Sequence, residues 1–272
     1  FRNIMNLKRL SLICVFAIVA PLASFTRVGD LQGPFKFFTT DRLGNIYVIT
    51  PKNDIRKYDA QFKKVAEANF KVLGDATLID AGNPMELFVF YKDQNKLVYF
   101  DNLLNYRGET DLNQSLNVNN ITTICRSYDN GFWFFDPDNF KLKKYDKQGN
   151  LLTESVNLAG VSDTVLAPTM MLDDGRFVFM KAGKDKVLMF DLLGNYIKTV
   201  FLGPFNAFQT RESLLIYNSG DSLFAYNPTT FDKGLLFVQS DTTLPSAGFG
   251  IKAEGKRIYV HHRQGITVYT EN

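Results

Sequence analysis

A stretch that repeats along the chain constrains its fold more than any other feature of the sequence. The first copy, residues 41–59, has a turn with Asp and Gly, a short apolar run, a second turn, and a second run ending in Tyr58-Asp59. Glycine suits the first turn because it tolerates positive φ, and runs rich in β-branched and aromatic residues favour strands. Each copy therefore predicts two consecutive strands.

The copies recur at a regular spacing. The aromatic-Asp pairs that close the second runs place their carboxylates at Asp59, Asp101, Asp146 and Asp191. The intervals are 42, 45 and 45 residues, and the triplet Gly33-Pro34-Phe35 returns 170 residues later at 203–205. A period of about 40–50 residues with four short strands per unit is typical of β-propellers. The 3.6-residue periodicity of helical repeats is missing.

The first copy also resembles the NHL-type repeat of six-bladed propellers, through Gly44-Asn45-Ile46-Tyr47-Val48, Asn53 and Ile55–Asp59. Later copies resemble it more loosely, at Tyr145–Asn150 and Phe190–Asn195. The resemblance implies the architecture. It implies no single activity, because such propellers serve as binding modules, scaffolds and enzymes.

The predicted fold is all-β, a six-bladed β-propeller of four-stranded antiparallel blades. The approximate units are 33–74, 75–120, 121–163, 164–204, 205–243 and 244–272. The last unit has room for only three strands, and a spare alternating segment, Phe25–Leu31, precedes the first unit. We therefore expect the N- and C-terminal segments to pair and close the ring, which removes exposed strand edges.

The first residues have the pattern of an export signal. Met5 is the expected start, Lys8 and Arg9 precede the apolar run Leu10–Val19, and small residues end it. This pattern predicts a secretory signal peptide. The alternative is an uncleaved membrane anchor, but the run is short for a span of about 20 residues. We expect a periplasmic or otherwise exported protein of the bacterial envelope.

Cleavage would divide the chain into residues 1–24 and a single propeller domain, residues 25–272, with no transmembrane span. The first segment holds three basic residues and no acid, so the remainder has 28 basic and 28 acidic residues. We predict no nucleic-acid partner, because phosphate binding needs a basic stripe. Only Cys125 remains after cleavage, so no internal disulfide can form, and we expect this thiol to be buried.

Metal chemistry has little support in the sequence. His261 and His262 are the only histidines, and neighbours on a strand point to opposite faces, so they cannot readily share an ion. We interpret them as a strand end with one exposed imidazole. Asp136, Asp138 and Asn139 offer oxygen ligands, but these residue types also form turns. We predict a turn and no cofactor, with calcium left open.

Binding residues are expected at two places. One face should carry the connections that enter each inner strand and those between the second and third strands. Loops on a rigid scaffold often bind partners, and the candidates there are Lys52, Asn53, Lys92, Asp93, Asp136, Asp138, Lys184, Asp221 and His262. Arg126, Gln209 and Arg211 lie on predicted inner strands. If they converge on the channel with a carboxylate, they would form an anionic-ligand pocket.

No nucleophile elbow of the Gly-x-Ser-x-Gly type occurs, and the acids are explained by repeated turns. The sequence favours a non-enzymatic module that binds a protein partner, with a small ligand as the second choice. A finer hypothesis is an accessory subunit of a bacterial envelope complex, such as the periplasmic plug of a type IX secretion translocon. The alternative is a lactonase-like hydrolase or a lyase, which would need convergent acids or amides at the channel mouth.

Overall fold

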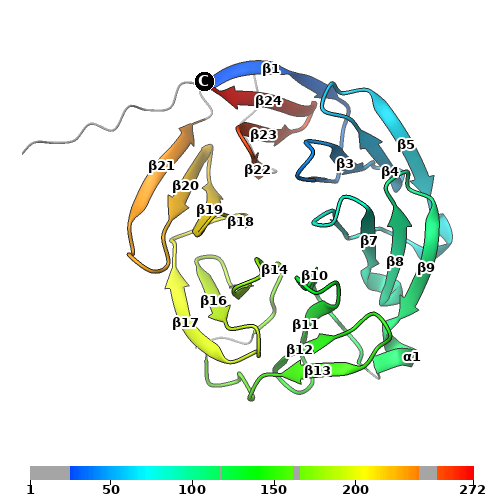
Figure 1. Cartoon of the computed structure of the whole chain (residues 1–272), viewed down its shortest axis with the longest axis vertical. Helices are drawn as coiled ribbons and strands as arrows, with labels where there is room; N and C mark the ends of the chain where they lie inside the picture. The colour runs from blue at the N-terminus through cyan, green and yellow to red at the C-terminus, as the bar shows by residue number, and fades with distance from the viewer. Residues whose placement is uncertain (1–24, 117, 162–165, 239–249) are drawn as a thin grey trace, which may run out of the picture.

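The described part of the chain forms a ring of six sheets around a central axis (Figure 1). The computed structural model describes residues 25–116, 118–161, 166–238 and 250–272. Each sheet has four antiparallel strands, ordered from the axis outward. The predicted six-bladed β-propeller is confirmed.

Five blades are built from consecutive strands. Blade 1 comprises β2 (Phe37–Thr40), β3 (Ile46–Ile49), β4 (Asp54–Tyr58) and β5 (Lys64–Asn69). Blade 2 comprises β6 (Leu78–Asp80), β7 (Glu86–Tyr91), β8 (Lys96–Asp101) and β9 (Tyr106–Asp111). Blade 3 comprises β10 (Ile124–Arg126), β11 (Phe132–Asp136), β12 (Lys141–Tyr145) and β13 (Leu151–Glu154). Blade 4 comprises β14 (Met171–Asp173), β15 (Val178–Ala182), β16 (Lys186–Phe190) and β17 (Tyr196–Phe201).

Blade 5 comprises β18 (Phe208–Arg211), β19 (Leu214–Ser219), β20 (Ser222–Tyr226) and β21 (Lys233–Val238). The helical elements are short: η1 (Lys71–Leu73), η2 (Lys92–Gln94) and α1 (Leu112–Leu116). Within the described residues, no helix has the length and apolar character needed to cross a membrane.

Blade 6 joins the two ends of the described chain. Its inner strands are β22 (Gly250–Glu254), β23 (Arg257–His262) and β24 (Gly265–Glu271), and its outermost strand is β1 (Phe25–Gln32). The β1 strand runs antiparallel to β24, from Phe25 opposite Glu271 to Gln32 opposite Gly265, with one irregularity after Arg27. Figure 1 shows the two strands side by side. The predicted closure is confirmed.

The repeated Asp folds the turn between the third and fourth strands. The Asp191 carboxylate accepts hydrogen bonds from the backbone N–H groups of Leu193 and Asn195, at 2.9 and 2.8 Å. The side-chain amide of Asn195 donates to the second oxygen at 2.9 Å. Gly194 between them has φ of +85°, a conformation that glycine adopts without steric cost. This chemistry explains why the motif Asp-x-x-Gly-Asn recurs.

These turns also join neighbouring blades, because their carbonyl groups point toward the preceding blade. Lys57 Nζ donates to the Asn102 carbonyl at 2.9 Å, and Arg257 Nη1 donates to the Ala60 carbonyl at 3.0 Å. The Thr153 hydroxyl donates to the Leu193 carbonyl at 2.8 Å. The repeat therefore supplies both the turn and an acceptor for the blade before it.

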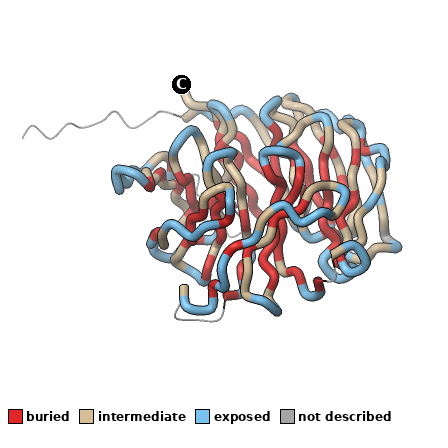
Figure 2. The backbone as a smooth tube through the Cα atoms, turned by 60° about the horizontal axis from the view of Figure 1, so that its bottom comes forward, coloured by how far each residue is buried: buried red, intermediate tan, exposed pale blue. Residues whose placement is uncertain are grey.

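The hydrophobic core lies between the blades. The second strands are buried along their whole length in β3 and β11, whereas the outer strands alternate between exposed and half-buried positions. Figure 2 shows this as buried strands with exposed turns at their ends. Trp133 and many Phe side chains are fully buried, and Cys125 is a buried free thiol, as predicted. Large aromatic side chains fill the space between two packed sheets.

Candidate functional site

A cavity lies on the axis of the ring, and the innermost strands of all six blades line it. Its volume is about 910 Å³, which is within the range of small-molecule sites. The wall is mixed. Apolar side chains such as Phe38, Ile79 and Phe208 alternate with charged ones from β6, β10 and β22. The cavity therefore offers both apolar contact and a few fixed charges.

Arg126 lies in this wall, but its charge is already compensated. Its guanidinium is 3.4 Å from Asp80 Oδ1 and 3.3 Å from Glu86 Oε1, and it donates to the Glu86 carbonyl at 2.9 Å. It also lies over the Phe88 ring, 5.0 Å from its centroid. All these partners belong to blade 2, so Arg126 joins blade 3 to blade 2.

Gln209 also lines the cavity and is also used between blades. Its amide oxygen accepts the Ala253 N–H at 3.0 Å, and its amide nitrogen donates to the Ala253 carbonyl. Arg211 is not in the cavity wall, and its guanidinium is 4.0 Å from Glu271. The expected convergence of Arg126, Gln209 and Arg211 is therefore not found, because each side chain faces a different neighbour.

Two acids of the wall are held by donors from their surroundings. Asp173 accepts hydrogen bonds from the Ser127 hydroxyl at 2.9 Å and from the Trp133 indole N–H at 3.0 Å. Asp41 accepts one from the Tyr47 hydroxyl at 2.9 Å. Burial raises the pKa of Tyr47, and the Asp41 carboxylate raises it further. These carboxylates stabilise the wall of the cavity.

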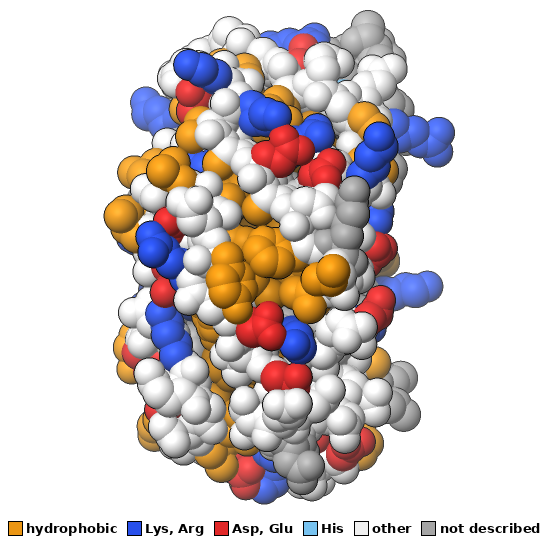
Figure 3. Space-filling view, turned by 90° about the vertical axis from the view of Figure 1, so that its right-hand side faces the viewer, with side chains coloured by type: hydrophobic (Ala, Val, Ile, Leu, Met, Phe, Trp, Pro, Cys, Tyr) orange, Lys and Arg blue, Asp and Glu red, His pale blue; other side chains and the backbone are white. Residues whose placement is uncertain are grey.

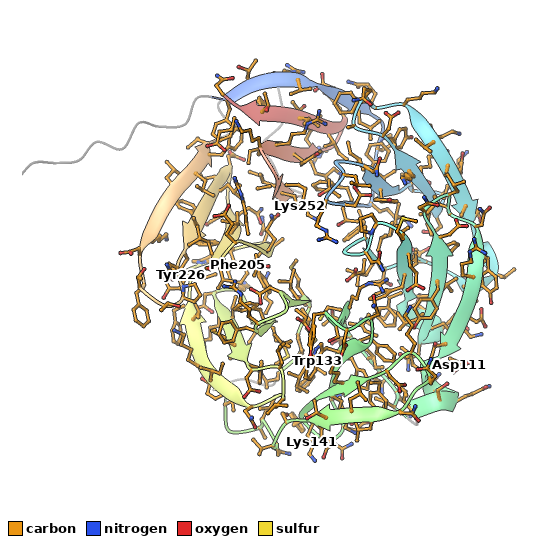
Figure 4. All side chains as sticks on the ribbon, in the orientation of Figure 1. Asp111, Trp133, Lys141, Phe205, Tyr226 and Lys252 are labelled. Carbon is orange, nitrogen blue, oxygen red and sulfur yellow. The ribbon has the colours of Figure 1, made fainter. Side chains whose placement is uncertain are left out.

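Lys252 and Glu254 differ from these groups and were missed by the sequence reasoning. Both lie on β22 and line the cavity, and Figure 4 shows Lys252 on the inner side of blade 6, beside the central opening. Burial lowers the pKa of the Lys252 ammonium. Burial also raises the pKa of Glu254, and the charges of Lys252 and Arg42 only partly offset this effect. The alternation Gly250-Ile-Lys-Ala-Glu254 was the available signal, because it places the two charges on one face of a strand.

Most loop candidates lie outside the cavity wall. The exposed ones are Lys52, Lys92, Asp93, Asp138 and Lys184, and Asp221 is half-buried. Asn53 lies between the second and third strands of blade 1, whereas Lys36 and Asp75 lie on connections that enter inner strands. The Asn53 side-chain oxygen is 3.2 Å from Lys36 Nζ, which also pairs with Asp75 at 3.0 Å. The loops between second and third strands therefore share a face with those entering the inner strands, as expected.

Asp136 is buried and forms a turn. Its carboxylate accepts the N–H groups of Asp138 and Asn139 at 3.0 and 3.2 Å, and Lys143 Nζ lies 2.8 Å away. Burial raises the pKa of Asp136, but the hydrogen bonds from Lys143 and Asn139 outweigh it and the net shift is downward. Its oxygens therefore face donors of the protein itself.

The expectation of one exposed imidazole is wrong, because both histidines are buried. His261 Nε2 is 3.1 Å from the Phe35 carbonyl, and its ring packs against Phe38. His262 Nε2 is 3.0 Å from the Thr267 hydroxyl, which donates to Asp30 at 2.6 Å. The cause is ring closure: β1 and the segment after it cover this end of β23. His262 is thus not a loop-face contact.

The architecture and the site define the class of the protein, a six-bladed β-propeller whose axial cavity has a mixed apolar and charged wall. No family model matches the chain, and no curated protein matches it. Solved structures of similar fold include a streptogramin B lyase, with 13% identity over 92% of this chain and 98% of that chain, at a TM-score of 0.61. Virginiamycin B lyase from Staphylococcus aureus has 12% identity over 92% of this chain and 99% of its own, at 0.63.

A third similar structure is the Pan2 WD40 domain of Neurospora crassa, with 9% identity over 93% of this chain and 97% of that chain, at a TM-score of 0.62. These propellers include both lyases and a WD40 domain. At such low identity the likeness establishes the fold alone, and the function has to be argued from the surface and the cavity.

Proposed function

We propose that this chain is an exported, non-catalytic propeller that binds a protein partner through the outer strands of blades 4 and 5. The observation that carries this proposal is the distribution of exposed apolar side chains. Seven of the eighteen large hydrophobic residues exposed in the described chain lie on blades 4 and 5. Contiguous exposed apolar surface on a soluble protein marks interaction sites.

The apolar side chains of blades 4 and 5 form what we call the outer rim, consisting of Leu193, Tyr196, Ile197, Phe201, Phe231, Leu235 and Val238. Lys198 joins the two blades, because it donates to the Pro228 carbonyl and lies 4.7 Å from the Phe231 ring centroid. Lys186 lies 5.7 Å from the Phe201 centroid. Aromatic anchors flanked by lysines suit a partner with apolar and acidic side chains.

A smaller apolar area lies on another side of the ring, over β5 and β9, where Figure 3 shows apolar side chains between charged ones. Phe70 stacks on Tyr106 there at 5.7 Å, and Val72 is 90% exposed. Because Phe70 is half-buried and packs against the core, this area has fewer free aromatic anchors than the outer rim. It provides the comparison surface for the experiment.

The outer rim is tested with the double substitution Phe201→Ser and Phe231→Ser. Both side chains are 66% exposed, so the melting temperature should change little. Losing two aromatic anchors should reduce recovery of the partner at least about tenfold in affinity purification from the source cells. Val72→Ser is the matched control and should recover the partner normally. Equal recovery by the rim variant and the parent would refute the proposed surface.

The finer part of the proposal places the protein in the periplasm, as an accessory subunit such as the plug of a type IX secretion translocon. It is supported by the signal-like residues 1–24, which lie outside the described residues, and by the NHL-like repeat of the first blade. Mass spectrometry of the exported protein should find a mature N-terminus near Phe25. Recovery of an intact chain with Leu10–Val19 embedded in the membrane would contradict export by cleavage.

The lactonase-like or lyase alternative is tested separately, with a panel of lactones and esters assayed with and without calcium. Glu254 is the acid in the cavity to substitute, because burial raises its pKa more than the charges of nearby cations lower it. Turnover by the parent that is lost in Glu254→Gln would replace the non-catalytic proposal with an enzymatic one.

A further inference from the structure

The axial cavity contains an ammonium group whose charge is not paired. Lys252 Nζ donates to the Thr39 hydroxyl at 2.8 Å and lies 3.4 Å from the Thr40 carbonyl. Both acceptors are neutral, and Lys252 forms no ion pair within the described chain. Removing an ammonium from water is costly, and burial lowers the pKa of this group more than the charges of Glu254, Asp80 and Asp41 raise it.

Arg126 is the useful comparison, because it is a cation in the wall of the same cavity. It pairs directly with two carboxylates, Asp80 and Glu86, whereas the hydrogen bonds of Lys252 go only to neutral oxygens. Both cations line the same cavity, so burial by itself does not explain why Lys252 lacks a carboxylate partner. The fold pairs Arg126 with carboxylates and leaves Lys252, another of the four cations that line the cavity, available to an anion that enters from solution.

Glu254 adds a second, opposite charge close by. It lies two residues from Lys252 on β22, lines the cavity, and has no ion pair in the part of the chain that the structure describes. Alternate residues of a strand face the same side and are about 7 Å apart along the strand. The cavity wall thus presents a cation and a carboxyl group from backbone positions about 7 Å apart, next to apolar side chains such as Phe38, Ile79 and Phe208.

We propose that the axial cavity binds a short zwitterionic peptide, with the terminal carboxylate on Lys252 and the terminal ammonium on Glu254. An extended chain rises about 3.3–3.6 Å per residue, so the two ends of a dipeptide are about 7 Å apart. The apolar wall then contacts the side chains of the peptide, and the volume of about 910 Å³ leaves room for them.

The test uses leucyl-leucine as the probe, measured by isothermal titration calorimetry with the chain comprising residues 25–272. We expect a dissociation constant below about 1 mM, as suits a ligand of this size. Leucyl-leucine amide lacks the carboxylate and N-acetyl-leucyl-leucine lacks the ammonium. Each should bind at least about tenfold more weakly, because one buried charge then stays unpaired.

The variants assign each end of the peptide to one residue. In Lys252→Met, leucyl-leucine and leucyl-leucine amide should bind equally weakly. In Glu254→Gln, leucyl-leucine and N-acetyl-leucyl-leucine should bind equally weakly. Lys184→Met is the control, because Lys184 is exposed and lies outside the cavity wall and should not affect binding. Thermal melts of each variant establish that it folds. Absence of heat up to 10 mM peptide (roughly tenfold above the expected constant), equal binding of all three peptides, or undiminished binding by Lys252→Met would overturn the proposal.

Discussion

Deleting residues 25–32 should bring the propeller close to unfolding, because this segment is the outermost strand of blade 6. The deletion removes the whole β1–β24 ladder, the buried Leu31 and the contact between Phe25 and Phe237. Leu31 is buried and Phe25 is half-buried. Full burial of one large apolar side chain contributes about 1.5–3 kcal/mol, and a typical domain has only about 5–15 kcal/mol to lose. Chemical denaturation followed by circular dichroism measures this loss.

The control for the deletion is a chain that begins at residue 25. It lacks only residues 1–24 and should keep the stability of the closed ring. The deleted chain should also elute as oligomers in size-exclusion chromatography, because β24 then has an unpaired edge. Similar unfolding curves for the two chains would show that blade 6 is stable without β1.

A point substitution tests the same closure. A Cβ atom at Gly265 would lie 2.0 Å from the Leu31 carbonyl oxygen, and this glycine has φ of +146°. Gly265→Ala should therefore separate β1 from β24, whereas Gly108→Ala places its Cβ in open space at the same φ of +146°. Both variants carry backbone strain of about 1–3 kcal/mol, so the excess loss in Gly265→Ala measures the clash. Equal losses would contradict the observed register.

The second large effect that we expect is a loss of stability in acid, and it comes from protonation of His261. Burial lowers the pKa of His261 to about 4 from its ordinary 6.5, and the hydrogen bond to the Phe35 carbonyl opposes this only in part. The neutral ring is the form that the folded state holds. The stability contribution is therefore fully present above pH 6.5 and is lost as the pH falls toward 4. The loss is about 3 kcal/mol once both states are protonated.

His261→Gln isolates this effect, because glutamine keeps an N–H donor for the Phe35 carbonyl and does not titrate. The free energy of unfolding is measured at pH 7.5, 5.5 and 4 for the parent and the variant. The parent should lose about 3 kcal/mol more than the variant over this range. Carboxylates that are paired in the folded state lose stability equally in both proteins. Parallel curves for the two proteins would exclude His261 as the cause.

The blade count and the repeated turns could be predicted from the sequence, because local chemistry produces them. Asp at the end of the third strand binds the backbone of the following turn, as at Asp191 and Asp101. Glycine commonly takes the left-handed position, and Leu104 takes it at φ of +61° where glycine is missing. Such interactions span four or five residues, so their sequence pattern survives in each copy. The last unit had room for only three strands, which implied that the N-terminal segment supplies its fourth strand.

The site depended on contacts between blades, which no local pattern contains. Arg126 and Lys252 look alike in sequence, as single cations on predicted inner strands. Only the packed ring shows that Arg126 faces Asp80 and Glu86, 46 and 40 residues away, whereas Lys252 faces the hydroxyl of Thr39 across 213 residues. The same holds for His261 and His262, whose burial requires the return of the N-terminal strand. Turns and strands are governed by neighbours in the chain, and the charge state of the cavity is governed by which blades meet at the axis.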